Sequence, residues 1–198
     1  MKKLMNLRGN ILKIIFSLFF IFIFSKQSIA NDLWSIDNNI STIEFEVPVL
    51  FATNVVGKFN TFDGFVSLDL SNQNNNKALL SVNIDSLDFN YKRYKNLVLS
   101  EVFFDAKNFP LALIDTNNFN LNYESKKINL VGQLTIKGKT QNIPLEIKIN
   151  KLASELVQVI TEISFSRNEF KIGTGNWKNT TILKDKIRIK ANIFLFKE

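Results

Sequence analysis

Alternation of apolar and polar residues with a period of two is the feature that most limits how this chain can fold. Four segments show it clearly and four more show it weakly: 42–49, 80–84, 143–149 and 187–195, then 65–70, 111–121, 128–136 and 156–165. A period of two places successive side chains on opposite faces of an extended backbone. These segments are therefore predicted to be half-buried antiparallel strands.

Turn-forming residues separate these segments at short intervals. They are Asp63-Gly64, the Asn-rich stretch 71–76, Asn117-Asn118, residues 124–127 and Gly138. Many short strands with regular turns predict a β-sandwich or a β-barrel in a single domain. One stretch, 91–99, departs from the alternation, because Tyr94, Leu97 and Val98 lie at helical spacing. One short helix is predicted there.

The first thirty residues have the pattern of a secretory signal peptide. Lys2, Lys3 and Arg8 form a basic leader before an apolar run at 14–24, and Ser28-Ile29-Ala30 has the small-x-small form of a cleavage site. The run is shorter than the roughly 20 apolar residues that a transmembrane helix needs. We therefore expect a signal peptide at 1–30, one β-domain at 31–198 located in the periplasm, and no stable membrane insertion.

Charge and missing residue types exclude several classes of function. The formal net charge is +7, but five basic and no acidic residues lie in the predicted signal peptide, which leaves a net charge of +2. A net charge this close to zero does not indicate a nucleic-acid-binding protein. The chain contains neither His nor Cys. Soft-metal sites and Ser-His or Cys-His catalysis are therefore excluded.

Residues 132–140, GQLTIKGKT, have a superficial likeness to a phosphate-binding loop. The motif has four residues between its glycines, whereas Gly132 and Gly138 are separated by five. Leu134 and Ile136 also follow the strand alternation, and no helix follows that could cap a phosphate. A hairpin turn at Lys137–Lys139 accounts for this segment better.

Carboxylates are the remaining candidates for chemistry. Asp85 and Asp88, with Asp105, come nearest to an acid pair, but acid–base catalysis needs one such group with a raised pKa in a cleft. Aspartates at strand ends more commonly cap turns, so no catalytic residue is predicted. Asp69 and the Asn-rich stretch do not match the spacing of an EF-hand calcium loop. No metal site is predicted.

Two aromatic segments raise the question of a ligand. In EVFFDAKNFP, residues 101–110, Phe103, Phe104 and Phe109 lie among polar residues and end at a proline. Arg167 precedes GTGNW, residues 173–177, in which two glycines lead to a tryptophan. Trp177 either plugs one end of a barrel or forms part of a ligand-binding mouth. The residues by themselves do not separate these alternatives.

Five blocks in order resemble the YceI-like family of exported lipocalin-fold proteins. They span 33–196: LWSIDNNISTIEFEVPVL, VVGKFNTFDGFVSLD, FFDAKNFP, GQLTIKGKTQNIPLEI and RNEFKIGTGNW…LKDKIRIKANIFL. Many family members read Arg-Asp-x-His-Leu before the third block. Here Tyr94–Val98 stand in its place, with Arg93 one position early. A role for that polar cluster is therefore not carried over.

The resemblance implies an all-β fold, an eight-stranded antiparallel lipocalin-like barrel with one short helix. In characterised members the barrel encloses a polyisoprenoid or quinone-like chain. Eight strands leave room for packed side chains or for one small ligand. Apolar residues expected to line the ligand are Phe45, Val47, Phe62, Val82, Ile84, Leu97, Phe103, Phe104, Phe109, Phe165 and Trp177. The three phenylalanines of 101–110 are expected to fold under the helix, with Asp105 turning the chain and Pro110 starting a strand.

The favoured hypothesis is a periplasmic carrier of a long isoprenoid- or quinone-type lipid. It needs no catalysis, no metal and no cofactor other than the lipid as ligand. Expected partners are the apolar lipid, a membrane or a quinone-linked membrane protein contacted transiently, and a second copy of the chain in a homodimer. One alternative is a ligand-free stress or interaction protein with a packed barrel. The other is an enzyme that uses Asp85, Asp88 or Asp105.

Overall fold

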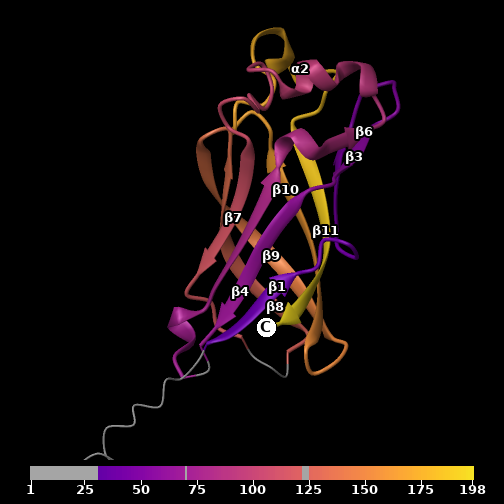
Figure 1. The fold of residues 1–198 in the computed structure, drawn as a ribbon. Helices are drawn as coiled ribbons and strands as arrows, with labels where there is room; N and C mark the ends of the chain where they lie inside the picture. Colours follow the sequence, from indigo (N-terminus) through magenta and orange to yellow (C-terminus); the bar gives the residue numbers. More distant parts are fainter. Residues whose placement is uncertain (1–30, 70, 122–124) are drawn as a thin grey trace, which may run out of the picture. The chain divides into compact units, whose positions relative to one another are not determined.

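The alternating segments pair into one antiparallel sheet that closes on itself (Figure 1). The structure is a computed structural model that describes residues 31–69, 71–121 and 125–198. The predicted signal peptide at 1–30 lies outside the described residues. The strands are β1 (Asp32–Ile36), β2 (Thr42–Val47), β3 (Val55–Phe59), β4 (Phe62–Leu68), β5 (Lys77–Asn83), β6 (Leu87–Phe89), β7 (Leu111–Asn117), β8 (Lys127–Ile136), β9 (Lys139–Lys151), β10 (Leu156–Ser166) and β11 (Lys186–Lys197).

Eight of these strands form a closed ring. Its order is β1-β4-β5-β7-β8-β9-β10-β11, and β11 pairs back onto β1. The remaining three strands, β2, β3 and β6, continue the sheet from the other half of β11. Three long strands of the barrel are thus each divided into two labelled strands: β1 and β2, β3 and β4, and β5 and β6. The predicted eight-stranded antiparallel barrel is confirmed.

Helical structure among the described residues is sparse and consists of one short α-helix and four 3₁₀ turns. The α-helix among the described residues is α2 (Lys95–Leu99), and the 3₁₀ turns are η1 (Gln73–Asn75), η2 (Ile84–Ser86), η3 (Lys92–Tyr94) and η4 (Gly175–Lys178). Together η3 and α2 cover most of the predicted helix at 91–99. Leu97 and Val98 pack against the buried core, as their helical spacing indicated.

The interrupted strands explain where the sequence pattern was incomplete. β1, β3 and β6 have only five, five and three residues, which is too short for alternation to be evident. The prediction of a turn at Asp63-Gly64 is wrong, because both residues lie inside β4. A Cβ on Gly64 would lie 2.3 Å from the Leu79 carbonyl oxygen of the neighbouring strand. Glycine is needed there for close backbone approach rather than for a turn.

Apart from the interruptions within the three divided strands, the connections between strands form two sets, one at each end of the barrel. At the end that carries α2 lie the connections 48–54, 90–110, 137–138 and 167–185, called the α2 end below. Several contacts hold this set together. Val49 forms an isolated bridge with Leu183, and Lys137 Nζ donates hydrogen bonds to the carbonyl oxygens of Glu101 and Lys171. The connections after β4, β7 and β9 and the C-terminus lie at the opposite, C-terminal end (Figure 1).

The hairpin at the α2 end has the geometry that its sequence predicts. Ile136 pairs with Lys139, so only Lys137 and Gly138 form the turn. Both have positive φ, 50° and 65°, as a type I′ hairpin turn requires. The segment 132–140 is therefore a strand–turn–strand hairpin, and no helix follows it.

Candidate functional site

A cavity of about 760 Å³ runs inside the barrel. Its wall includes residues from the α2 end, such as Tyr94 and Trp177, and residues from the C-terminal end, such as Leu68 and Lys151. The buried hydrophobic residues form two separate clusters rather than one, and the cavity is lined by members of both. Side chains therefore coat the interior of this barrel without filling it.

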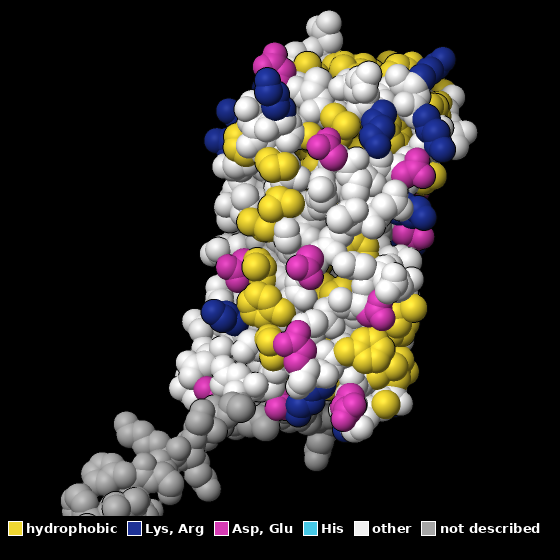
Figure 2. All heavy atoms as spheres, in the orientation of Figure 1, with side chains coloured by type: hydrophobic (Ala, Val, Ile, Leu, Met, Phe, Trp, Pro, Cys, Tyr) yellow, Lys and Arg dark blue, Asp and Glu magenta, His cyan; other side chains and the backbone are white. Residues whose placement is uncertain are grey.

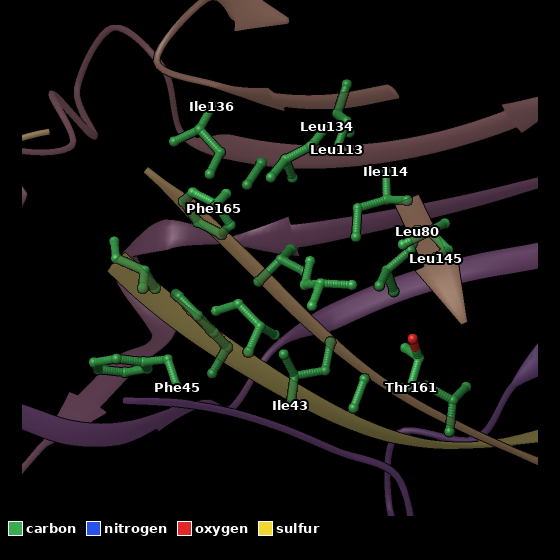
Figure 3. A pocket seen from close by; sticks show the side chains of 18 of the residues that line it. Ile43, Phe45, Leu80, Leu113, Ile114, Leu134, Ile136, Leu145, Thr161 and Phe165 are labelled. Carbon is green, nitrogen blue, oxygen red and sulfur yellow. The ribbon is translucent and has the colours of Figure 1, made fainter. Parts of the chain in front are cut away.

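The middle of the cavity is almost wholly apolar. Figure 3 shows side chains from different strands, among them Ile43, Ile114 and Leu145, pointing into the same space. Alternation produces this wall, because each strand turns one apolar set inward and its polar set to solvent. Thr161 is a polar exception, and its hydroxyl already donates a hydrogen bond of 2.9 Å to the Glu146 carbonyl oxygen.

Among the residues that the structure describes, charged groups enter the cavity wall only at its ends. The charged lining residues are Arg93 and Arg167 at the α2 end and Asp32, Lys151 and Lys197 at the C-terminal end. Asp32 and Lys197 form an ion pair of 2.8 Å. A long apolar molecule in the barrel would therefore meet hydrocarbon along its length and polar groups only near its tips.

The segment after α2 folds back to close part of the α2 end. Backbone bonds from Phe104 N to Val98 O (3.1 Å) and from Ala106 N to Leu99 O (2.9 Å) return the chain under the helix. Phe103 becomes buried, with its ring centroid 5.4 Å from that of Trp177. Asp105 turns the chain in a left-handed conformation, with φ of 51°.

Arg167 organises the long connection between β10 and β11. Its side chain is 1% exposed, and its guanidinium donates to the carbonyl oxygens of Ile172, Gly173, Asn179, Leu183 and Lys184 at 2.9–3.4 Å. Burial lowers the pKa of this guanidinium, and the nearby Asp185 carboxylate partly opposes that shift. Buried polar groups are stable when their hydrogen bonds are satisfied, so this arginine fixes the loop that carries Trp177.

The sequence that forms this barrel matches a known domain family. Residues 34–195 match the YceI-like domain family. The chain belongs to the YceI-like family. A curated relative, the UPF0312 protein YE1254 of Yersinia enterocolitica, is 31% identical over 107 residues. That alignment covers 54% of this chain and 55% of the relative, so the chain spans about half the length of the curated relatives it matches.

Solved structures share the barrel. The crystal structure of Burkholderia cenocepacia BcnA has a TM-score of 0.70 and 26% identity, covering 80% of this chain and 98% of BcnA. A polyisoprenoid binding domain from Saccharophagus degradans has a TM-score of 0.65, covering 83% of this chain and 98% of that domain. Its identity is only 10%, so it supports the fold alone.

Nine of the eleven residues predicted to line a ligand border the cavity of this YceI-like domain. They are Phe45, Val47, Val82, Ile84, Leu97, Phe103, Phe104, Phe165 and Trp177. Phe62 and Phe109 do not. Phe62 is buried in the wall, and Phe109 is 36% exposed and lies against Gly138 outside the barrel. Contact between the nine and a ligand stays a prediction.

Other lining residues of the YceI-like domain were not singled out from the sequence. They include Ile114, Leu134 and Leu145 on β7, β8 and β9, and Tyr94 and Ile182 at the α2 end. Alternation contained the signal for the strand residues, because their phase marks the inward face. It contained none for Ile182, which belongs to an irregular connection.

The acids considered as catalysts lie elsewhere. None of Asp85, Asp88 and Asp105 lines the large cavity. Asp88 pairs at 3.8 Å with the exposed Lys92, and Asp105 accepts a 3.0 Å hydrogen bond from the Asn108 side chain. Among the residues that the structure describes, no three Asp or Glu side chains cluster as a metal site would require. The predicted role of Asp105 in turning the chain agrees with its geometry.

Asp69 is the centre of a hydrogen-bonded turn in this YceI-like domain. Its carboxylate accepts bonds from the Ser71 hydroxyl (2.6 Å), the Asn75 amide (2.8 Å) and the backbone N–H of Ser71 and Asn72. These bonds, with that of Ser71 the largest, hold the pKa of Asp69 well below its usual range. Asp69 and the Asn-rich stretch thus form a structural turn.

Proposed function

We propose that this YceI-like domain is a carrier or sequestering protein that holds one long apolar lipid, of isoprenoid or quinone type, inside its barrel. The continuous apolar cavity carries the proposal. Its volume of about 760 Å³ lies within the range of about 300–1,000 Å³ that is usual for ligand sites. Each Å² of hydrocarbon surface buried there stabilises the complex by about 25 cal/mol, without any hydrogen bond.

The placement of charge supports an apolar ligand rather than a reaction. The candidate carboxylates lie outside the cavity wall, and the charged lining residues lie at its ends. The shared fold of the polyisoprenoid binding domain from Saccharophagus degradans agrees with this assignment. We therefore propose binding without catalysis. The alternative of a packed barrel is disfavoured because the interior contains an open cavity.

We also propose that the protein acts in the periplasm. The leader-like pattern of residues 1–30 supports export. None of the described helices is long and apolar enough to cross a membrane. The expected homodimer stays a prediction.

Organic-solvent extraction of the purified protein, followed by mass spectrometry, tests the proposed cargo. One lipid class at about one molecule per chain is the expected result. A titration provides a second readout, because both tryptophans of the chain, Trp34 and Trp177, line the cavity. A long polyprenol added to extracted protein should change their fluorescence in a saturable manner. Absence of bound lipid together with an unchanged fluorescence would contradict the proposal.

A further inference from the structure

Positive charge is concentrated at the α2 end of the barrel. The four connections at the α2 end hold eight lysine and arginine residues besides the buried Arg167: Lys92, Arg93, Lys95, Lys107, Lys137, Lys171, Lys178 and Lys184. They hold four acids: Glu101, Asp105, Glu169 and Asp185. With Arg167 included, nine cations against four acids give these connections a net charge of +5. Figure 2 shows Lys and Arg side chains gathered around the upper end, whereas Asp and Glu predominate below.

The C-terminal end is close to neutral, because the strand ends there add Lys77, Lys127, Lys151 and Lys197 against Asp32. Its described connections and terminus hold Asp69, Glu155 and Glu198 against one cation, Lys126. Six of the eight cations at the α2 end are exposed, whereas the Nζ atoms of the half-buried Lys137 and Lys184 donate hydrogen bonds to backbone carbonyl oxygens. Only Lys92 among them forms an ion pair within the part of the chain that the structure describes. The excess of positive charge thus lies at the α2 end, which also carries the mouth residues described below.

Exposed apolar side chains protrude from the same end. Phe51 is 97% exposed at the tip of the connection 48–54, and Ile182 is 65% exposed in the connection 167–185. The two tips are neighbours, because Leu50 N donates a 2.8 Å hydrogen bond to Ile182 O. Phe51 also has a φ of 58°, an unfavourable conformation for an aromatic residue. Neither its exposure nor its backbone conformation stabilises the isolated protein.

These tips border the mouth of the cavity. Ile182 and Ala52, the residue after Phe51, line the cavity although both are exposed. Tyr94 and Trp177 line the cavity at the same end, and each is 40% exposed. Tyrosine and tryptophan are the residues that favour the interface between lipid headgroups and hydrocarbon. The mouth is therefore rimmed by interfacial aromatics, protruding apolar tips and cations.

We propose that the α2 end docks on an anionic lipid bilayer, with Phe51 and Ile182 inserted and the surrounding cations on the headgroups. The inference rests on the proposed function for its purpose, because docking there would connect the cavity mouth to the hydrocarbon of the bilayer. Apolar tips among cations are typical of interfacial membrane contacts. An acidic protein partner would match the charge but would leave the protruding Phe51 without hydrocarbon to enter.

Flotation of the purified protein with vesicles tests the docking. Vesicles of equal parts phosphatidylglycerol and phosphatidylcholine are compared with vesicles of pure phosphatidylcholine. Each is tested at about 20 mM salt, where charges are weakly screened, and at about 300 mM salt, where they are strongly screened. We expect binding to the anionic vesicles at low salt, at least about tenfold weaker binding to the neutral ones, and loss of binding at high salt.

Two variants test the residues. Phe51→Ser with Ile182→Ser removes the apolar tips, and Lys95→Glu with Lys178→Glu reverses two exposed cations. Each cation near an anionic surface contributes about fivefold in affinity, so the charge variant should bind at least about 20-fold more weakly. Matched controls lie away from the α2 end: Leu152→Ser, and Lys77→Glu with Lys148→Glu, all at exposed positions. The controls should bind within about twofold of wild type.

The outcomes separate this inference from the proposed function. Wild-type protein that fails to float with anionic vesicles at low salt overturns the docking and favours a protein partner for this end. Equal losses in the test and control variants also overturn it. Polyprenol titration of the same samples tests the cargo independently. Vesicle binding without polyprenol binding would support the docking and contradict the proposed carrier function. Polyprenol binding without vesicle binding would support the carrier function and contradict the docking.

Discussion

The ring of Phe109 lies directly over Gly138. A Cβ added to Gly138 would be 2.7 Å from Cε1 of Phe109, closer than packed atoms allow. Two segments separated by almost thirty residues meet here, and the aromatic ring covers the hairpin turn instead of entering the barrel. This contact explains why Phe109 lies outside the cavity while Phe103, six residues earlier, lines it.

Gly138→Ala should lower the free energy of unfolding by more than about 1 kcal/mol. A positive φ of 65° disfavours alanine, and the contact with Phe109 adds to that cost. Gly175→Ala is the matched control, because Gly175 has a φ of 60° but no atom near its added Cβ. Urea unfolding should show a larger loss for Gly138→Ala than for Gly175→Ala. Equal losses would mean that the Phe109 contact is unimportant.

Val82→Trp should abolish lipid retention. Val82 lines the cavity, so an indole there occupies space that the ligand would fill. Val131→Trp, at an exposed site on β8, should retain lipid like wild type. Extraction with mass spectrometry measures retention, and thermal unfolding shows whether the fold persists. In a tightly packed core the same change would cost about 1–3 kcal/mol. Full retention by a folded Val82→Trp variant would exclude Val82 from the lipid site.

Arg167→Met should destabilise the protein by on the order of 3 kcal/mol. The substitution keeps much of the apolar volume but leaves several buried carbonyl oxygens without donors, each worth about 1–3 kcal/mol. Arg188→Met is the control, because Arg188 forms partly exposed ion pairs with Glu46 and Glu162. Such pairs contribute about 0–1 kcal/mol. Chemical denaturation that shows the same small loss for both would contradict the role assigned to Arg167.

Asp69→Asn should reduce stability at neutral pH and have less effect in acid. The folded pKa of Asp69 is lower than the unfolded value near 3.9, so its contribution is present above about pH 4. That contribution is lost as pH falls below 4 toward the folded pKa. The difference in unfolding free energy between wild type and Asp69→Asn should therefore narrow between about pH 5 and pH 2. A difference that is constant with pH would rule out this linkage.

Phe51→Asn should raise stability and lower vesicle binding together. Asparagine tolerates the left-handed conformation better than an aromatic residue, so relief of strain should add up to about 1 kcal/mol. Loss of the apolar tip should weaken flotation with anionic vesicles. Thermal unfolding and flotation on the same preparation measure both effects. A variant that is more stable but binds vesicles as well as wild type does would show that Phe51 takes no part in membrane docking.

Much of the barrel could be predicted because its strands are long enough to show their periodicity. β9 and β11, with 13 and 12 residues, alternate over several repeats. β1, β3 and β6 could not be found in this way, because interruptions leave each with at most five residues. The glycine of Asp63-Gly64 suggested a turn, because a sequence does not distinguish a glycine needed for positive φ from one needed for close approach.

The sequence by itself determined which face of each long strand is apolar and which catalytic groups are missing. Alternation decides that Ile43 and Leu145 share an inward phase, and the lack of His and Cys removes whole classes of chemistry. Only the tertiary structure decided that the interior is hollow, because the distance between opposite walls depends on the number and stagger of strands rather than on any strand's pattern. The fold also placed Phe109 outside the barrel and gathered the cations of three separate connections at one end. In an up-and-down barrel alternate connections lie at the same end, so residues far apart in sequence share one surface.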